Sequence, residues 1–218
     1  AIDGPAASGK GAVAQAVAER LGFHYLDSGA IYRAAAFAIT KAGLAVDRLP
    51  EADIAKIASN MQLSFQNSAI YISNQNVTDL IRSEECGKNA SKIAVLPKLR
   101  QALLELQHSF RRVPGLVAEG RDMGTVVFPD AGLKIFLTAS AEVRAERRYK
   151  QLMAKGINAT IANLLQEIEA RDARDLGRSV APLRASESTI TIDTSALDLT
   201  QSIDAVLKLY QPNASKNE

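Results

Sequence analysis

The chain has 218 residues and a mass of 23.4 kDa; 47% of its residues are hydrophobic and 23% are charged. This balance excludes a disordered, collagen-like or low-complexity protein and predicts one domain with a substantial core. The net charge of +2 is too small to indicate a nucleic-acid partner by itself. With a single cysteine, Cys86, and no apolar run near the roughly 20 residues of a membrane span, we expect a cytoplasmic protein without a membrane partner.

Strands and helices alternate along most of the chain. The sequence opens on Ala1-Ile2-Asp3, and because buried strands usually run 4–8 residues we expect it to begin inside its first strand. Apolar residues at helical spacing follow, and residues 23–26 then have a strand pattern. Further strands are predicted at 116–118, 133–137 and 189–192, with helical patterns at 96–110 and 203–210. This alternation predicts a parallel sheet covered by helices on both faces.

One region breaks the alternation. Residues 61–65 and 69–72 have period-two patterning, are joined by a short turn at 66–68 and are followed by Val77. They predict a β-hairpin outside the parallel sheet, hence a small inserted subdomain. The polar residues 212–218 are expected to fray.

A glycine-rich segment lies between the first strand and the first helix. Small residues let successive backbone N–H groups curl around a phosphate, the helix N-terminus adds positive potential, and a lysine can reach the β- and γ-oxygens. These features predict a phosphate-binding loop rather than a plain turn, and the loop consists of Gly4, Pro5, Ala6, Ala7, Ser8, Gly9 and Lys10.

The residues after the lysine depart from the usual pattern. A Ser or Thr hydroxyl is expected there to approach Mg²⁺, either directly after the lysine or one residue later. The chain instead has Gly11 and Ala12, so neither position offers a hydroxyl.

An apolar stripe becomes charged towards its end. Ile161, Leu164, Leu165 and Ile168 follow helical spacing, and the same face continues to Arg171, Asp175 and Arg178, with Arg174 close by. A solvated helix end would explain the charges, but beside a phosphate-binding loop we favour a role in holding phosphate. The charged run 142–150 contains Arg144, Arg147 and Arg148, for which a soluble face and a phosphate contact are equally favoured.

An acidic residue and an arginine follow each of two predicted strands. Arg121 and Asp122 follow the strand near residue 118, while Asp27 precedes Ser28 and Arg33 after the second strand. Ligands of parallel sheets bind beyond the carboxyl ends of the strands, although Asp27 or Ser28 also fits a helix N-cap. His24 and His108 have no partner at metal-ligand spacing, and no residue is assigned as a direct metal ligand.

Four motifs in order resemble the bacterial cytidylate kinase family of P-loop nucleoside monophosphate kinases. They are Asp3 to Gly11, Asp27-Ser28-Gly29-Ala30-Ile31-Tyr32-Arg33, Gly120-Arg121-Asp122-Met123-Gly124-Thr125-Val126-Val127-Phe128-Pro129, and Arg171-Asp172-Ala173-Arg174-Asp175, with Val180-Ala181-Pro182-Leu183 as a fifth marker. The resemblance implies an α/β P-loop kinase of three layers, with a central parallel five-stranded sheet, a small antiparallel β insertion and a helical lid. It implies a core at about 1–55 and 88–218, the insertion at about 56–87 and the lid at about 144–180.

The resemblance also implies an activity and its residues. The activity is transfer of the γ-phosphoryl group of ATP, with Mg²⁺, to CMP or dCMP by a monomer. Gly4 to Ala12 bind ATP. Ser28, Arg33 and Arg121 bind the CMP phosphate, with Asp122 next to them. Ser91 and Arg100 contact cytosine, helped by Arg178, and Arg171 and Asp175 face the sugar. The catalytic group comprises Lys10, Arg121, Asp122 and Arg171. Departures from the family pattern are Ala12 for Thr, Glu119 for Asp and His108 for Arg.

Other functions stay open at this point. A related kinase of UMP, AMP or shikimate has the same scaffold and differs in its acceptor contacts. A nucleotide-dependent switch protein is disfavoured because the chain has no Asp-x-x-Gly switch after a strand and no Asn-Lys-x-Asp. A nucleic-acid-binding module is disfavoured by the near-neutral charge.

Overall fold

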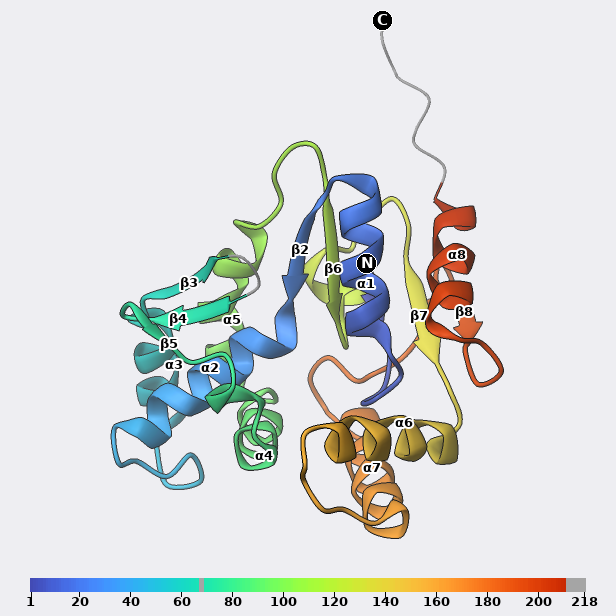
Figure 1. The fold of residues 1–218 in the computed structure, drawn as a ribbon. Helices are drawn as coiled ribbons and strands as arrows, with labels where there is room; N and C mark the ends of the chain where they lie inside the picture. The colour runs from blue at the N-terminus through green and yellow to red at the C-terminus, as the bar shows by residue number, and fades with distance from the viewer. Residues whose placement is uncertain (67–68, 211–218) are drawn as a thin grey trace, which may run out of the picture. The chain divides into compact units, whose positions relative to one another are not determined.

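The computed structural model describes residues 1–66 and 69–210. The chain divides into two compact units, one of residues 1–26 together with the chain from 111 onward, and one of residues 27–110 (Figure 1). The finer division predicted from the sequence, into core, insertion and lid, stays a prediction.

A five-stranded sheet organises the first unit. Its order is β2-β6-β1-β7-β8, with β1 (Ile2–Asp3) parallel to both β6 and β7 and β7 parallel to β8. The other strands are β2 (His24–Asp27), β6 (Leu116–Gly120), β7 (Ile135–Thr138) and β8 (Ile190–Asp193). The predicted parallel sheet is therefore confirmed. Because Asp3 pairs in register with Gly120, the loops that follow β1 and β6 leave the same edge of the sheet.

Four helices accompany this sheet: α1 (Lys10–Leu21), α6 (Ala141–Ala154), α7 (Ile161–Leu176) and α8 (Leu199–Leu209). The predicted stripe of α1 is buried at Val13 and Val17, which pack with Ile135 and Leu137 of β7. A second apolar cluster joins α6 to α7 through Ala145, Leu152, Leu164 and Ile168, and Ala7 of the phosphate-binding loop packs against it. The loop is thus supported by the sheet below and by α6 and α7 beside it.

The second unit combines helices with a three-stranded antiparallel sheet. Its elements are α2 (Ser28–Lys41), α3 (Glu51–Ser59), β3 (Leu63–Gln66), β4 (Ala69–Ile72), β5 (Gln75–Asn76), the short helix η1 (Leu80–Arg82), α4 (Glu84–Ile93) and α5 (Pro97–His108). Leu63 pairs with Ile72 and Gln66 with Ala69, so the predicted hairpin is confirmed. Asn67 and Ser68 of its predicted turn lie outside the described residues, as do residues 212–218.

Candidate active site

The phosphate-binding loop leaves β1 and enters α1 as predicted. Gly9, at the N-cap of α1, has φ of 87°, and Ala7 has φ of 58°. Both values lie in the left-handed region, which is an unfavourable conformation for alanine. The packing of Ala7 against α6 and α7 holds it in this conformation. At Gly4 a Cβ atom would stand 2.1 Å from the carbonyl oxygen of Leu137, so only glycine fits beside β7.

Lys10 is buried at the start of α1. Its Nζ donates a hydrogen bond to the carbonyl oxygen of Pro5 at 3.2 Å and lies 3.7 Å from Oε2 of Glu119. Tyr25 donates its hydroxyl to Oε1 of the same carboxylate at 3.4 Å. A Cβ atom at Gly11 would stand 3.2 Å from Glu119 Oε1, so the glycine leaves room for the carboxylate.

Glu119 was not assigned to the site from the sequence. It was noted only as a departure from a common Asp, although its place directly before Gly120 at the end of β6 could have indicated it. The structure places its carboxylate beside the lysine of the phosphate-binding loop, and the residue as a whole is only 7% exposed.

A buried carboxylate fixes the loop after β6. Asp3 accepts hydrogen bonds from the backbone N–H groups of Met123 and Gly124, both at 2.8 Å. Burial raises the pKa of Asp3, and these two hydrogen bonds oppose the rise. The π-helical turn η2 (Met123–Val127) begins there, with Asp122 buried at its start. The carboxylate of Asp3 therefore connects the end of β1 to the start of η2, directly after Arg121 and Asp122.

Three predicted site residues form one charged cluster in the first unit. Asp175, fully buried, accepts from Arg121 Nε at 2.9 Å and from a terminal nitrogen of Arg178 at 2.5 Å. Burial alone would raise the pKa of Asp175, but the charges of Arg121 and Arg178 hold the pKa below its ordinary value. The structure thus brings together residues that are 54 positions apart in the sequence.

The helical face predicted to include Arg178 ends earlier than expected. α7 stops at Leu176, and Gly177, a poor helix former, follows it. Arg178 therefore lies beyond the helix and reaches Asp175 from the following segment. Arg171 is partly buried on α7, whereas Arg174 is exposed.

Three of the predicted residues make hydrogen bonds within the second unit. Asp27 is the N-cap of α2 and accepts from the backbone N–H of Ala30 at 2.9 Å, so the capping interpretation is confirmed. Ser28 donates its hydroxyl to Gln107 Oε1 at 2.7 Å in a buried contact. Arg33 donates to the carbonyl oxygens of Ile81 and Ser83, both at 3.0 Å.

Ser91 and Arg100 also belong to this unit. Ser91 Oγ is buried and makes no hydrogen bond within residues 1–66 and 69–210, so it can serve a ligand. Arg100 donates to the carbonyl oxygen of Ala94 at 3.3 Å. The predicted acceptor residues are thus divided between the two units, with Ser28, Arg33, Ser91 and Arg100 in one and Arg121, Asp122, Arg171, Asp175 and Arg178 in the other.

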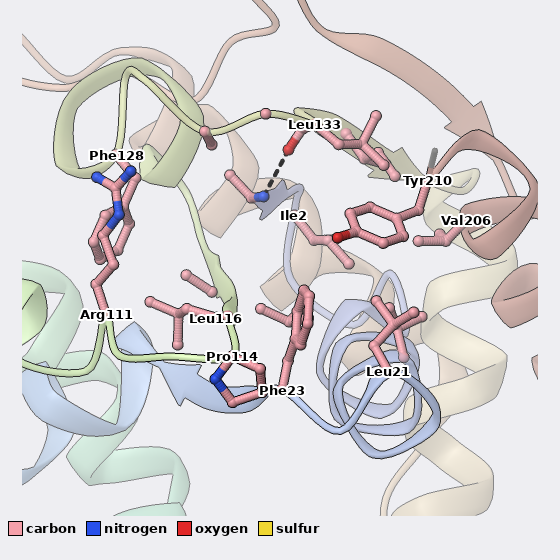
Figure 2. A pocket seen from close by; sticks show the side chains of 18 of the residues that line it. Ile2, Leu21, Phe23, Arg111, Pro114, Leu116, Phe128, Leu133, Val206 and Tyr210 are labelled. Atoms are coloured by element: carbon pink, nitrogen blue, oxygen red, sulfur yellow. Dashed lines mark hydrogen bonds between the residues drawn. The ribbon is translucent and has the colours of Figure 1, made fainter. Parts of the chain in front are cut away.

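A cavity of about 580 Å³ lies elsewhere in the first unit. Ile2, Leu116 and Leu133 line it at the amino-terminal ends of β1 and β6 and beside β7, and Phe23 and Tyr210 point into it (Figure 2). It includes none of the predicted site residues. The phosphate-binding loop instead follows the carboxyl end of β1, where ligands of parallel sheets bind.

The sequence model of the family described as cytidylate kinase matches residues 1–212. The chain belongs to the cytidylate kinase family. Proteins named cytidylate kinase from Polynucleobacter asymbioticus and Cupriavidus necator are 54% and 52% identical to it. The alignments cover 97% and 96% of this chain and 95% and 94% of theirs. A cytidylate kinase of Nitrosomonas europaea is 51% identical over 96% of this chain and 93% of its own.

A solved structure, TT1252 from Thermus thermophilus, is 20% identical to this member of the cytidylate kinase family, and the alignment covers 96% of both chains. Its TM-score of 0.44 is too low to support an inference. Among residues 1–66 and 69–210, no helix is both long and apolar enough to cross a membrane.

Proposed function

We propose that this chain transfers the γ-phosphoryl group of ATP to CMP or dCMP, giving CDP or dCDP. Membership of the cytidylate kinase family makes it a nucleoside monophosphate kinase. The observation that carries the proposal further is that the phosphate-binding loop after β1 and Arg121 after β6 leave one edge of the same sheet, with Arg121 held by Asp175 of α7.

The reaction asks the protein mainly for alignment and neutralisation of charge. The attacking oxygen of the CMP phosphate is already ionised, so no general base is needed. In this proposal backbone N–H groups of the phosphate-binding loop hold the phosphates of ATP, while Lys10 supplies charge to the transferring group. Lys10 already stands at the start of α1 with Glu119 beside it, which supports this role.

The acceptor contacts are assigned from the family motifs. We assign the CMP phosphate to Ser28, Arg33 and Arg121, with Asp122 beside them. The cytosine ring is assigned to Ser91, Arg100 and Arg178, and the sugar to Arg171 and Asp175. The buried hydroxyl of Ser91 and the charged cluster around Asp175 support the last two assignments. Closure of the lid around both nucleotides would exclude water and limit ATP hydrolysis.

Phosphoryl transfer by this family needs a divalent metal ion, which we propose is Mg²⁺ bound together with ATP. The hydroxyl of Ser8 is buried and makes no hydrogen bond with any described residue, and the Glu119 carboxylate lies against Gly11. Within the described ranges no group of three His, Cys, Asp or Glu side chains could hold a metal by itself. These oxygens fit a hard cation held mainly by phosphates and water, with Ser8 and Glu119 as its protein neighbours. When bound, the ion would neutralise charge on the β- and γ-phosphates.

We further propose that the enzyme acts as a monomer in the cytoplasm, with ATP and CMP or dCMP as its small-molecule partners. Nucleic acid and membrane have no role in the proposed reaction.

A coupled assay that detects ADP tests the function directly. ATP is presented separately with CMP, dCMP, UMP, AMP and shikimate. We expect turnover with CMP and dCMP to exceed turnover with the other acceptors by at least about tenfold, because a site built to hydrogen-bond one base rejects others strongly. Preference for UMP, AMP or shikimate would assign the chain to another kinase, and binding of ATP without turnover on any acceptor would favour a regulatory protein.

A further inference from the structure

Cationic side chains hold the carbonyl oxygens of the phosphate-binding loop. Lys10 binds the carbonyl oxygen of Pro5, as described above. Arg144 of α6 donates from a terminal nitrogen to the carbonyl oxygen of Ala6 at 3.2 Å, and Arg147, one turn later, donates to that of Ser8 at 3.3 Å. α6 therefore contacts the loop through two arginines in addition to its apolar side chains.

These hydrogen bonds fix the direction in which backbone N–H groups of the loop point. In a trans peptide the C=O and the following N–H point in opposite directions, and the peptides after Ala6 and Ser8 are both trans. An arginine that holds the carbonyl of Ala6 on the α6 side turns the N–H of Ala7 away from α6. Arg147 turns the N–H of Gly9 away in the same manner. Amides directed away from α6 are available to an anion held within the loop.

Arg144 is itself held from three directions. Its Nε donates to the carbonyl oxygen of Ala139 at 2.9 Å, and the nitrogen that contacts Ala6 also lies 2.6 Å from Oδ2 of Asp172 on α7. The side chain is only 7% exposed. A guanidinium with these contacts connects the residue after β7, α7 and the loop, because its planar fork keeps one geometry.

We propose that Arg144 is a positioning residue for ATP, that Asp172 holds it in place, and that the pair orients the amides of the phosphate-binding loop. This inference rests on the proposed function, in which the loop binds ATP. It gives α6 a role other than direct phosphate contact, which the sequence left open for Arg144. Because Asp172 adjoins Arg171, the same pair links the loop to the helix that carries the proposed sugar contacts.

The two roles predict opposite effects of one conservative substitution. If Arg144 positions the loop, Asp172→Asn weakens the interaction that holds Arg144 in place and so weakens binding of the triphosphate. If Arg144 instead contacts phosphate directly, Asp172→Asn releases the arginine and strengthens binding. Asn keeps the shape of Asp and an oxygen that accepts from Arg144, so the substitution removes the charge with little change in packing.

The test is titration calorimetry of the full chain with the magnesium complex of a non-hydrolysable ATP analogue. We expect Asp172→Asn and Arg144→Lys each to weaken binding about tenfold, since a lysine keeps the charge but has a single nitrogen in place of the planar fork whose separate nitrogens hold the three oxygens. The control variants are Asp204→Asn and Arg20→Lys, an exposed ion pair of the same unit, which should stay within about twofold of the unsubstituted chain.

Three results would overturn the inference. They are tighter binding by Asp172→Asn, unchanged affinity in Asp172→Asn, and unchanged affinity in a folded Arg144→Lys. If Arg144 and Asp172 had a purely structural role, the two substitutions would lower the melting temperature and leave the affinity of the folded protein unchanged. If Arg144→Lys does not fold, Asp172→Asn decides alone. Failure of the unsubstituted chain to bind the analogue would overturn the proposed function as well, whereas normal binding with unaltered variants would overturn only this inference.

Discussion

Arg121 and Asp175 meet at 2.9 Å, although one follows β6 and the other lies near the end of α7. Asp175 is fully buried and also binds Arg178, so it carries a negative charge between two arginines. The carboxylate therefore sets the position of two side chains that we assign to the acceptor nucleotide. Arg121 belongs to this cluster and Lys10 to the phosphate-binding loop, so substitutions at these two positions are expected to affect different substrates.

Arg121→Ala is expected to damage binding of the acceptor and to spare ATP. Loss of a charge-assisted contact to the CMP phosphate should weaken CMP binding by roughly tenfold or more, because hydrogen bonds between charged groups are stronger than neutral ones. Titration calorimetry with CMP and with a non-hydrolysable ATP analogue separates the two sites. Loss of ATP affinity with unchanged CMP affinity would contradict the assignment.

Asp175→Asn is expected to reduce stability in a pH-dependent manner. The pKa of Asp175 lies below its ordinary value of 3.8, so its ionised form stabilises the fold above that pH, and the stabilisation is lost as pH falls through the lower folded pKa. At neutral pH the variant should lose on the order of 2 kcal/mol, or roughly 4–8 °C in Tm. The difference should shrink below about pH 4.

Thermal unfolding of both proteins from pH 7 to pH 3 measures this difference. Asp204→Asn, which alters an exposed pair, serves as the control and should shift Tm little. A Tm difference for Asp175→Asn that stays constant with pH would mean that its charge does not contribute.

Lys10→Ala is expected to lower kcat by about 10²–10³-fold while the fold persists, since the lysine supplies charge to the transferring group. The exposed Lys155→Ala provides a comparison of the same residue type in the same unit. Steady-state rates and circular dichroism check both expectations. A loss below about threefold in a folded variant would remove Lys10 from the mechanism.

Gly4→Ala is expected to destabilise the protein severely. The new Cβ atom would stand 2.1 Å from a backbone oxygen of β7, which cannot move without disturbing the sheet. We expect a loss of about 3 kcal/mol or more, or roughly 6–12 °C in Tm. Gly132→Ala is the matched control because its methyl group meets no atom within 4 Å. Equal melting temperatures for the two variants would show that the close approach has no energetic consequence.

Ala12→Thr is expected to lower the Mg²⁺ concentration needed for the half-maximal rate. Neither Gly11 nor Ala12 offers a hydroxyl, so the metal should depend on water and on carboxylates at the strand ends, as a water-bridged contact can replace a direct one. Mg²⁺ titration at fixed free ATP measures the change, and Ala12→Val, which adds the same bulk without a hydroxyl, is the control. Identical Mg²⁺ curves for all three proteins would exclude position 12 from metal positioning.

Local patterns in the sequence were sufficient for the glycine-rich turn between β1 and α1, the parallel sheet, the hairpin and the family. A glycine-rich turn between a strand and a helix, or period-two patterning on either side of a short turn, depends on neighbouring residues. The motifs around Ser28, Arg121 and Arg171 identified the family because their order along the chain is itself part of the sequence. The end of α7 was the main error, since the charged face was continued past Gly177 to Arg178.

Only the tertiary structure decided which charged groups meet. Arg144 and the carbonyl oxygen of Ala6 are separated by 138 residues, and Glu119 reaches Lys10 because β6 lies beside β1 in register. In the sequence, Arg144 and Asp172 are two charges in helical runs that resemble any solvated surface. Their burial depends on how α6 and α7 pack on each other and against the phosphate-binding loop, and no local pattern encodes that packing because it results from many contacts between distant segments.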